Sequence, residues 1–254
     1  MKVAFFQYDI VWQDKEANFQ KVENQLKAGI DADVLVLPEM FSTGFCMEPE
    51  GLAEPTEGRT VALLQKWSEL YDLAICGSFI ALEGGKYYNR GFFITPTNAY
   101  YYDKHHLFVI GAEGAHYTAG DKPLIINYRG WNIALQICFD LRFPVWARNV
   151  DNAYDLLVYV ANWPTSRVSA WNVLLVARAI ENQAYVCGVN RVGMDDFGSD
   201  HNGCSAVYDF KGNALIKLED GLEKLTVVEI SKEELDRFRK KFPVYRSADR
   251  FEIK

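Results

Sequence analysis

The chain has 254 residues, of which 49% are hydrophobic and 24% are charged, and its formal net charge is −7. This balance is typical of a globular protein with enough apolar material for a large core. The negative charge argues against a general role on nucleic acids or membrane surfaces, because both favour basic patches. Five cysteines without regular spacing indicate a reducing compartment, so we expect a cytoplasmic protein.

No linker rich in Pro, Gly or Ser divides the sequence, so residues 1–254 are expected to form a single domain. The first residues, Met1 to Gln7, are too short an apolar run for a signal peptide and predict a strand. No stretch is long and apolar enough to predict a membrane span.

The spacing of apolar residues predicts strands that alternate with helices near both ends of the chain, with hairpins in between. Asp14 and Ser231 are expected to cap the first and last helices. Residues 103–121 show neither period and are expected to be a long functional loop. Expected strands lie at 2–8, 34–37, 74–81, 88–95, 100–102, 124–128, 131–137, 156–160, 184–190, 204–208, 214–218 and 225–230, and expected helices at 14–30, 59–71, 169–183 and 231–241.

This order of elements predicts an α/β fold with two mixed sheets and helices on the outside, rather than a helix bundle or an all-β sandwich. The helix at 169–183 is apolar nearly all round and is therefore expected to be buried. The tail from Val244 to Lys254 has no period of its own.

The segment from Trp131 to Pro144 places a cysteine at the end of a predicted buried strand. Cys138 follows the apolar run, and Pro144 is expected to begin a helix over residues 145–149. A strand-to-helix turn aims a side chain at the carboxyl edge of a sheet and leaves backbone N–H groups free. A lone cysteine is more often a small buried hydrophobe, so this placement alone does not identify a nucleophile.

Glu39 and Lys104 also fall at or just past the ends of predicted strands. If they share one pocket with Cys138, the three side chains could act together as a catalytic group. A nearby ammonium lowers a thiol pKa, and a carboxylate within reach can take the thiol proton and deliver it to a leaving amine. The ammonium and the backbone N–H of Phe139 could hold an oxyanion. Charged residues near strand ends are often only solvated, so spacing does not prove convergence.

Three segments around these residues resemble the motifs of the nitrilase, or carbon–nitrogen hydrolase, superfamily, in the family's order. The resemblance implies a four-layer αββα sandwich in which Glu39 is the general base, Lys104 stabilises the oxyanion and Cys138 is the nucleophile. It further implies that Glu113, in the loop after the lysine, orients the lysine; a surface glutamate is the alternative. The segments are Leu37-Pro38-Glu39-Met40-Phe41, Tyr102-Asp103-Lys104-His105-His106-Leu107-Phe108 and Ile137-Cys138-Phe139-Asp140-Leu141-Arg142-Phe143-Pro144.

Further segments resemble the bacterial omega-amidase branch of that superfamily. The resemblance implies hydrolysis of the terminal amide of a short 2-oxo acid such as 2-oxoglutaramate, through a thioester and without a cofactor or metal. The partner is then a small-molecule amide. The segments are Met40-Phe41-Ser42-Thr43-Gly44-Phe45, Pro144-Val145-Trp146-Ala147-Arg148-Asn149, Asn162-Trp163-Pro164 and residues 177–185.

A substrate with a free carboxylate needs a cation, and arginine binds carboxylates best. Arg167 is the first choice and Arg191 a further candidate, whereas Arg142 is expected to brace its turn through Asp140. We expect three aromatic residues to wall a small pocket, although core packing would explain each equally well. They are Phe41, Phe139 and Trp163.

The chain departs from the family pattern at Ala134 and Gln136, where many members have glycines, and at Phe139, where many have tyrosine. These differences leave the size and polarity of the pocket open. A nitrile, an aliphatic amide or an N-carbamoyl compound also remains possible, since the same triad serves each.

A Cys–His hydrolase, a metal enzyme and a non-catalytic binding protein are the remaining readings. The four histidines lie in no local motif, and the spacings typical of metal sites are absent from the sequence. Family members commonly pair, so a homodimer is expected, with Trp146 and the helix around Trp171 as a possible face.

Overall fold

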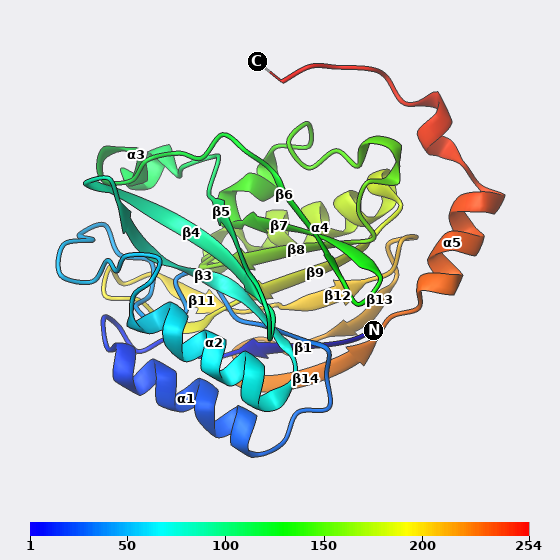
Figure 1. The fold of residues 1–254 in the computed structure, drawn as a ribbon. Helices are drawn as coiled ribbons and strands as arrows, with labels where there is room; N and C mark the ends of the chain where they lie inside the picture. The colour runs from blue at the N-terminus through cyan, green and yellow to red at the C-terminus, as the bar shows by residue number, and fades with distance from the viewer. Residues whose placement is uncertain (254) are drawn as a thin grey trace.

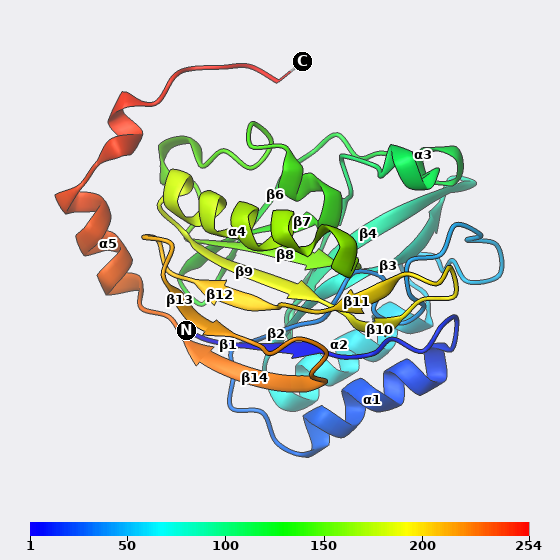
Figure 2. The same ribbon diagram turned by 180° about the vertical axis from the view of Figure 1, so that it is seen from behind.

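The structure is a computed structural model that describes residues 1–253. Two six-stranded mixed β-sheets lie face to face, with helices on both outer faces (Figures 1 and 2). Helices α1 (Lys15–Lys27) and α2 (Arg59–Tyr71) cover one sheet, and α4 (Val168–Asn182) covers the other. The predicted αββα sandwich is therefore confirmed.

The first sheet has the strand order β14-β1-β2-β3-β4-β5. The pairs β1–β2 and β2–β3 are parallel, and the other neighbours are antiparallel. As a result β2 and β5 run in the same direction and end at the same edge. The strands are β1 (Lys2–Gln7), β2 (Val34–Val36), β3 (Ala74–Glu83), β4 (Lys86–Ile94), β5 (Ala99–Asp103) and β14 (Lys224–Glu229).

The second sheet has the order β13-β12-β9-β8-β7-β6, with β7, β8 and β9 parallel. A separate two-stranded hairpin joins β10 (Val192–Met194) to β11 (Asp200–Asn202). The strands of the sheet are β6 (Leu124–Tyr128), β7 (Trp131–Ile137), β8 (Leu156–Ala161), β9 (Tyr185–Asn190), β12 (Ala206–Tyr208) and β13 (Ala214–Lys217).

Three apolar layers hold the sandwich together. Between the sheets, side chains such as Val36, Phe93 and Val158 are fully buried. Separate cores fill the space between each sheet and its helices. Burial on both faces explains why the central strands are almost continuous runs of apolar residues. Among residues 1–253, no helix has the length and hydropathy needed to cross a lipid bilayer.

Most predicted elements are present. The predicted bounds of α2 match, Asp14 accepts a hydrogen bond from Ala17 N at the start of α1, and Ser231 caps α5 (Lys232–Lys241). The loop at 103–121 contains two short elements that its sequence pattern did not reveal. They are η1 (Val109–Gly111) and α3 (Glu113–His116), and the tail carries η5 (Val244–Ser247).

The helix predicted after Pro144 is absent. The helical turn begins earlier, as η2 (Cys138–Arg142), and the next residue, Phe143, has extended backbone. A residue that precedes proline is disfavoured in the helical region, so Pro144 ends this turn instead of beginning a helix. Residues 144–147 form turns, followed by the short η3 (Val150–Asn152).

The apolar composition of helix α4 predicts burial on all sides, but one side of the helix is exposed. Trp171 and Leu175 face the sheet, whereas Val173 and Ile180 are 67% and 52% exposed. A helix in an outer layer has a sheet on one side only, so its other apolar face remains uncovered. The side chains of Trp146 and Trp171 are both buried in the core, so of the dimer face expected at Trp146 and the helix around Trp171, only the outer side of the helix is exposed.

Candidate active site

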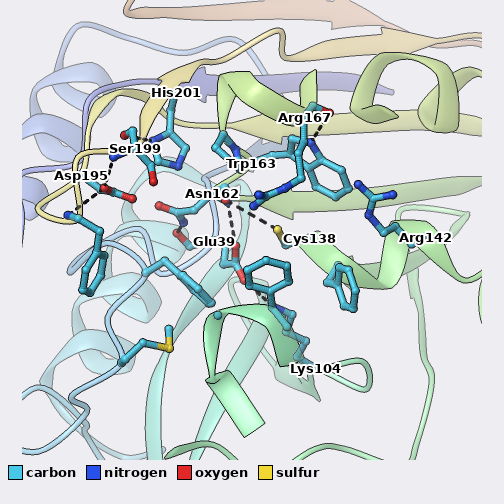
Figure 3. Close-up of a pocket in the computed structure, with 17 residues that line it drawn as sticks. Glu39, Lys104, Cys138, Arg142, Asn162, Trp163, Arg167, Asp195, Ser199 and His201 are labelled. Carbon is cyan, nitrogen blue, oxygen red and sulfur yellow. Dashed lines mark hydrogen bonds and ion pairs between the residues drawn. The ribbon is translucent and has the colours of Figure 1, made fainter. Parts of the chain in front are cut away.

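Glu39, Lys104 and Cys138 line one cavity of about 260 Å³ (Figure 3). Glu39 comes shortly after β2, Lys104 directly follows β5, and Cys138 directly follows β7. The strands β2 and β5 belong to one sheet and β7 to the other, so the cavity lies where the carboxyl ends of these three strands meet. Ligands of α/β proteins bind at such edges. The structure thus brings together the three side chains that are far apart in the sequence.

The ammonium of Lys104 lies between two buried glutamates. Its Nζ is 3.0 Å from Glu39 Oε1 and 2.9 Å from Glu113 Oε2, and all three side chains are at most 1% exposed. Burial lowers the pKa of Lys104, but Glu113 and Glu39 raise it, and the net direction is upward. Lys104 therefore stays charged, and the cluster as a whole carries one negative charge when both glutamates are ionised.

Glu113 stands at the start of the four-residue helix α3. Besides Lys104, its carboxylate accepts the backbone N–H of Phe108 at 2.5 Å, which ties the loop to the cluster. Burial raises the pKa of Glu113. The side chain is fully buried, so the alternative of a solvated surface glutamate is wrong.

Cys138 occupies a strained turn. Its φ is +44°, a left-handed conformation that residues with a Cβ rarely adopt. Asp140 anchors the turn, because its Oδ2 accepts from Ile137 N at 3.1 Å and from the Tyr102 hydroxyl at 2.7 Å. The first N–H groups of the helical turn lack partners within it. The expected nucleophile turn is therefore present, although no longer helix follows it.

The thiol of Cys138 is half-buried, and its Sγ is 4.0 Å from the carbonyl oxygen of Asn162. Burial and the charge of Glu39 raise its pKa, while Lys104 lowers it, and the net direction is upward. The resting thiol is therefore protonated at neutral pH. A base would have to remove this proton for the sulfur to act as a nucleophile.

Of the residues predicted to contact substrate, Phe139, Trp163 and Arg167 line the cavity. Phe41 does not, which corrects that prediction. The left-handed backbone at Met40 (φ +45°) turns the chain after Glu39, and the ring of Phe41 packs in the core against Phe92 at a centroid distance of 5.6 Å.

Two arginines line the cavity without an ion-pair partner among residues 1–253. The guanidinium of Arg142 lies 5.0 Å from the centre of the Trp163 ring. The guanidinium of Arg167 lies 5.1 Å from the centre of the Phe108 ring. The predicted brace between Arg142 and Asp140 is wrong, because the backbone N–H of Ile137 and the Tyr102 hydroxyl hold that carboxylate instead.

Arg191 is excluded as a substrate ligand. It is fully buried and does not line the cavity, and its Nη2 is 2.7 Å from Asp9 Oδ1. The same guanidinium donates to the backbone carbonyls of Val192 and Ile10. These contacts hold the base of the β10–β11 hairpin against the end of β1.

The β10–β11 hairpin forms a wall of the cavity that sequence reasoning missed. In Figure 3, Asp195, Ser199 and His201 lie opposite the two arginines. The strands of this hairpin are too short for a clear alternation of apolar and polar residues. The glycines at 193 and 198 were the available signal for a turn. The remaining lining residues are Phe45, Met47, Phe108, Gly111, Asn162, Pro164 and Phe197.

The histidines do not form a pair with Cys138 through any hydrogen bond of the described residues. His105 stacks on Trp146 at 3.7 Å, and His106 bonds to Asp140. His201 shares the cavity, but its Nδ1 is 3.1 Å from the carbonyl of Ser199. Within residues 1–253, no three His, Cys, Asp or Glu side chains are grouped so that they could hold a metal ion.

Comparison with known proteins places this geometry in a family. Residues 2–240 match the family model described as carbon-nitrogen hydrolase. The chain belongs to the carbon–nitrogen hydrolase family. This agrees with the resemblance of the three motifs, and it means that the protein is a hydrolase of carbon–nitrogen bonds.

Several relatives of this carbon–nitrogen hydrolase match it over nearly their whole length. The omega-amidase YafV of Yersinia enterocolitica is 42% identical over 252 residues, which cover 99% of this chain and 98% of that protein. The 2-oxoglutaramate amidase of Bacillus subtilis is 30% identical, and the match covers 96% of this chain and 95% of that protein.

A solved structure with a similar fold is a CN-hydrolase superfamily protein of Xanthomonas campestris with an arsenic adduct in its active site. Its TM-score is 0.97 at 36% identity, and the match covers 100% of this chain and 99% of that chain. A nitrilase-superfamily protein of Saccharomyces cerevisiae has a TM-score of 0.86 at 25% identity, with 96% and 94% coverage.

Proposed function

We propose that this hydrolase cleaves the terminal amide of a small 2-oxo dicarboxylic acid monoamide, such as 2-oxoglutaramate, to the acid and ammonia. The observation that carries the proposal is a cavity that combines a thiol beside a carboxylate–ammonium cluster with two guanidinium groups that have no ion-pair partner among residues 1–253. The names of relatives at 30–42% identity point to the same substrate class.

In the first half of the reaction, Glu39 takes the proton of the Cys138 thiol as sulfur attacks the amide carbon. The oxyanion of the tetrahedral intermediate is held by the charged ammonium of Lys104, which contacts Glu39 Oε1 and both carboxylate oxygens of Glu113 in the resting site, and by the backbone N–H of Phe139. Glu39 then passes the proton to the leaving nitrogen. Ammonia departs and a thioester remains on Cys138.

In the second half, Glu39 removes a proton from water, and the resulting hydroxide attacks the thioester carbon. The same oxyanion site holds the second tetrahedral intermediate. Its collapse breaks the carbon–sulfur bond, and the proton on Glu39 returns to the sulfur. Glu113 takes no proton in this scheme. It orients Lys104 and keeps its ammonium charged through the contacts at 2.9 and 3.1 Å.

The two arginines would bind the free carboxylate of the substrate. A guanidinium forms two parallel hydrogen bonds with a carboxylate, and an apolar wall strengthens such a pair by excluding water. Arg167 is held in place through its carbonyl, which accepts Trp163 Nε1–H at 2.8 Å. Arg142 lies in the turn after Cys138, so both cations sit on the nucleophile's side of the cavity (Figure 3).

A substrate panel tests this proposal. Ammonia release from 2-oxoglutaramate, an uncharged aliphatic amide, a nitrile and an N-carbamoyl amino acid should be compared with wild-type enzyme and Cys138→Ala. We expect the highest kcat/KM for the 2-oxo acid amide and no turnover by Cys138→Ala. Preference for the nitrile or the N-carbamoyl compound would contradict the substrate class, and turnover by Cys138→Ala would contradict the mechanism.

We also propose that residues 1–254 act as one domain, as a homodimer in the cytoplasm. The continuous core between the sheets supports a single unit. Exposed apolar residues on and beside α4, namely Val145, Val173 and Ile180, support pairing through that face. Light scattering on wild type and on Val173→Glu would test the dimer: loss of pairing in the variant is expected, and a monomeric wild type would refute it.

A further inference from the structure

Asn89, fully buried on β4, lies between the two glutamates of the site. Its Nδ2 donates to Glu39 Oε1 at 2.8 Å and to Glu113 Oε1 at 3.2 Å. Its backbone carbonyl accepts the N–H of Lys104 at 3.0 Å. One asparagine therefore contacts all three members of the buried ion cluster, although it belongs to none of the motifs that revealed them.

A chain of hydrogen bonds determines how the Asn89 carboxamide is oriented. The backbone N–H of Met40 donates to Ser78 Oγ at 2.8 Å, and that hydroxyl donates to Asn89 Oδ1 at 2.9 Å. Because Oδ1 is used as an acceptor, both hydrogens of Nδ2 are directed at the carboxylates. The chain closes on itself, since Met40 follows Glu39 in the sequence.

These contacts make the two oxygens of Glu39 different. Oε1 accepts from both Asn89 and Lys104, which uses its two lone pairs. Oε2 accepts the backbone N–H of Asn162 at 2.8 Å, its one hydrogen bond among the described residues. A lone pair of Oε2 is therefore left for a further proton.

The surroundings of the carboxylates make this arrangement necessary. Two buried carboxylates that share a site repel each other, which favours protonation of one of them. The other titratable groups that face them are the ammonium of Lys104, the thiol of Cys138 and the phenol of Tyr117. Only Lys104 among these is a cation, so N–H donors must supply the remaining stabilisation of the ionised carboxylates.

We propose that Asn89 is a positioning residue that keeps Glu39 ionised and reserves its Oε2 as the atom that takes the Cys138 proton. This inference rests on the proposed roles of Glu39 and Cys138. In the acylation step the S–H bond breaks, an O–H bond forms on Oε2, and the sulfur electron pair forms the bond to the amide carbon. Asn89 itself exchanges no proton.

The test is Asn89→Asp, which keeps the shape of the side chain but replaces its two donors with a third carboxylate. Exchange of an N–H donor for a like-charged neighbour destabilises the ionised form of the buried carboxylate cluster. The acidic limb of kcat/KM against pH should therefore move to higher pH by about one unit or more. At pH 7, kcat should fall at least about tenfold and recover in part as the pH is raised.

Ser78→Ala is the milder companion, because it removes only the hydroxyl that fixes the carboxamide. We expect its acidic limb to shift in the same direction by less. Asn18→Asp is the matched control: Asn18 is equally buried and donates to the carbonyls of Val11 and Ser42, away from the cluster. It should lower the melting temperature and leave the pH profile unchanged.

The outcomes separate this inference from the proposed function. Folded Asn89→Asp with the wild-type pH profile would overturn the role of Asn89, even if its activity were lower. If that variant does not fold, an unshifted limb in Ser78→Ala overturns it instead. Activity in Cys138→Ala would overturn the proposed function itself, whereas an inactive Cys138→Ala beside an unshifted Asn89→Asp would overturn this inference alone.

Discussion

Asn162 donates twice to Glu39: its backbone N–H lies 2.8 Å from Oε2, and its Nδ2 lies 2.5 Å from the backbone carbonyl oxygen. The two residues are 123 positions apart and follow β8 and β2, which belong to different sheets. Asn162 also presents its carbonyl oxygen to the Cys138 thiol. One residue thus fixes Glu39 relative to Cys138 across the boundary between the two sheets.

Asn162→Ala keeps the backbone donor and removes the side-chain bond. The carbonyl of Glu39 then loses its buried partner, which should cost about 1–3 kcal/mol of stability. If Glu39 is the base, as proposed, its looser placement should also lower kcat about tenfold with a smaller change in KM. Thermal unfolding and steady-state kinetics check both. Unchanged kcat in a destabilised variant would show that the bond serves the fold only.

Cys138 should be the first of the five cysteines to react with iodoacetamide, because it is half-buried and the other four are buried. The net upward shift of its thiol pKa predicts slow labelling at neutral pH and faster labelling as the pH rises. Lys104→Met removes the charge that lowers the pKa of Cys138, so the labelling rate of Cys138 should rise only at higher pH than in the wild type. Mass spectrometry of labelled peptides measures each site. Equal rates at all five cysteines would contradict this prediction.

Arg142→Ala and Arg167→Ala should each raise KM for an amide that carries a carboxylate by about tenfold or more. An uncharged amide should be affected much less, because it does not use the guanidinium. Arg237→Ala is a suitable control, since Arg237 is exposed on α5 and pairs with Glu233. Equal effects on both substrates would mean that these arginines support the cavity without recognising the carboxylate.

Glu113→Gln should lower kcat and shift the alkaline limb of the pH profile. Glu113 and Glu39 both raise the pKa of Lys104, so removal of one carboxylate lowers that pKa. Lys104 then loses its proton at a lower pH, and the alkaline limb should move down. Glu233→Gln is the control, because Glu233 is an exposed glutamate that pairs with Arg237 on α5. An alkaline limb at its wild-type position would exclude the proposed effect of Glu113 on the lysine.

Local patterns in the sequence were sufficient for much of the fold. Continuous apolar runs such as 34–37 and 156–160 predict strands covered on both faces, and Asp14 and Ser231 mark helix starts by their own side-chain hydrogen bonds. Such signals act within a few residues, so they can be read without knowing the partner elements. Where a competing local rule applied, the prediction failed: Pro144 ends a helical turn because it constrains Phe143.

The sequence by itself determined which chemistry is available, because three motifs supply a thiol, a carboxylate and an ammonium at the ends of strands. Only the tertiary structure decided their arrangement. Phe41 packs in the core, Arg191 forms an ion pair with Asp9, and the hairpin at 192–202 forms a wall of the cavity. These outcomes depend on contacts between residues far apart in the chain, and neither periodicity nor residue type encodes which distant group a side chain will meet.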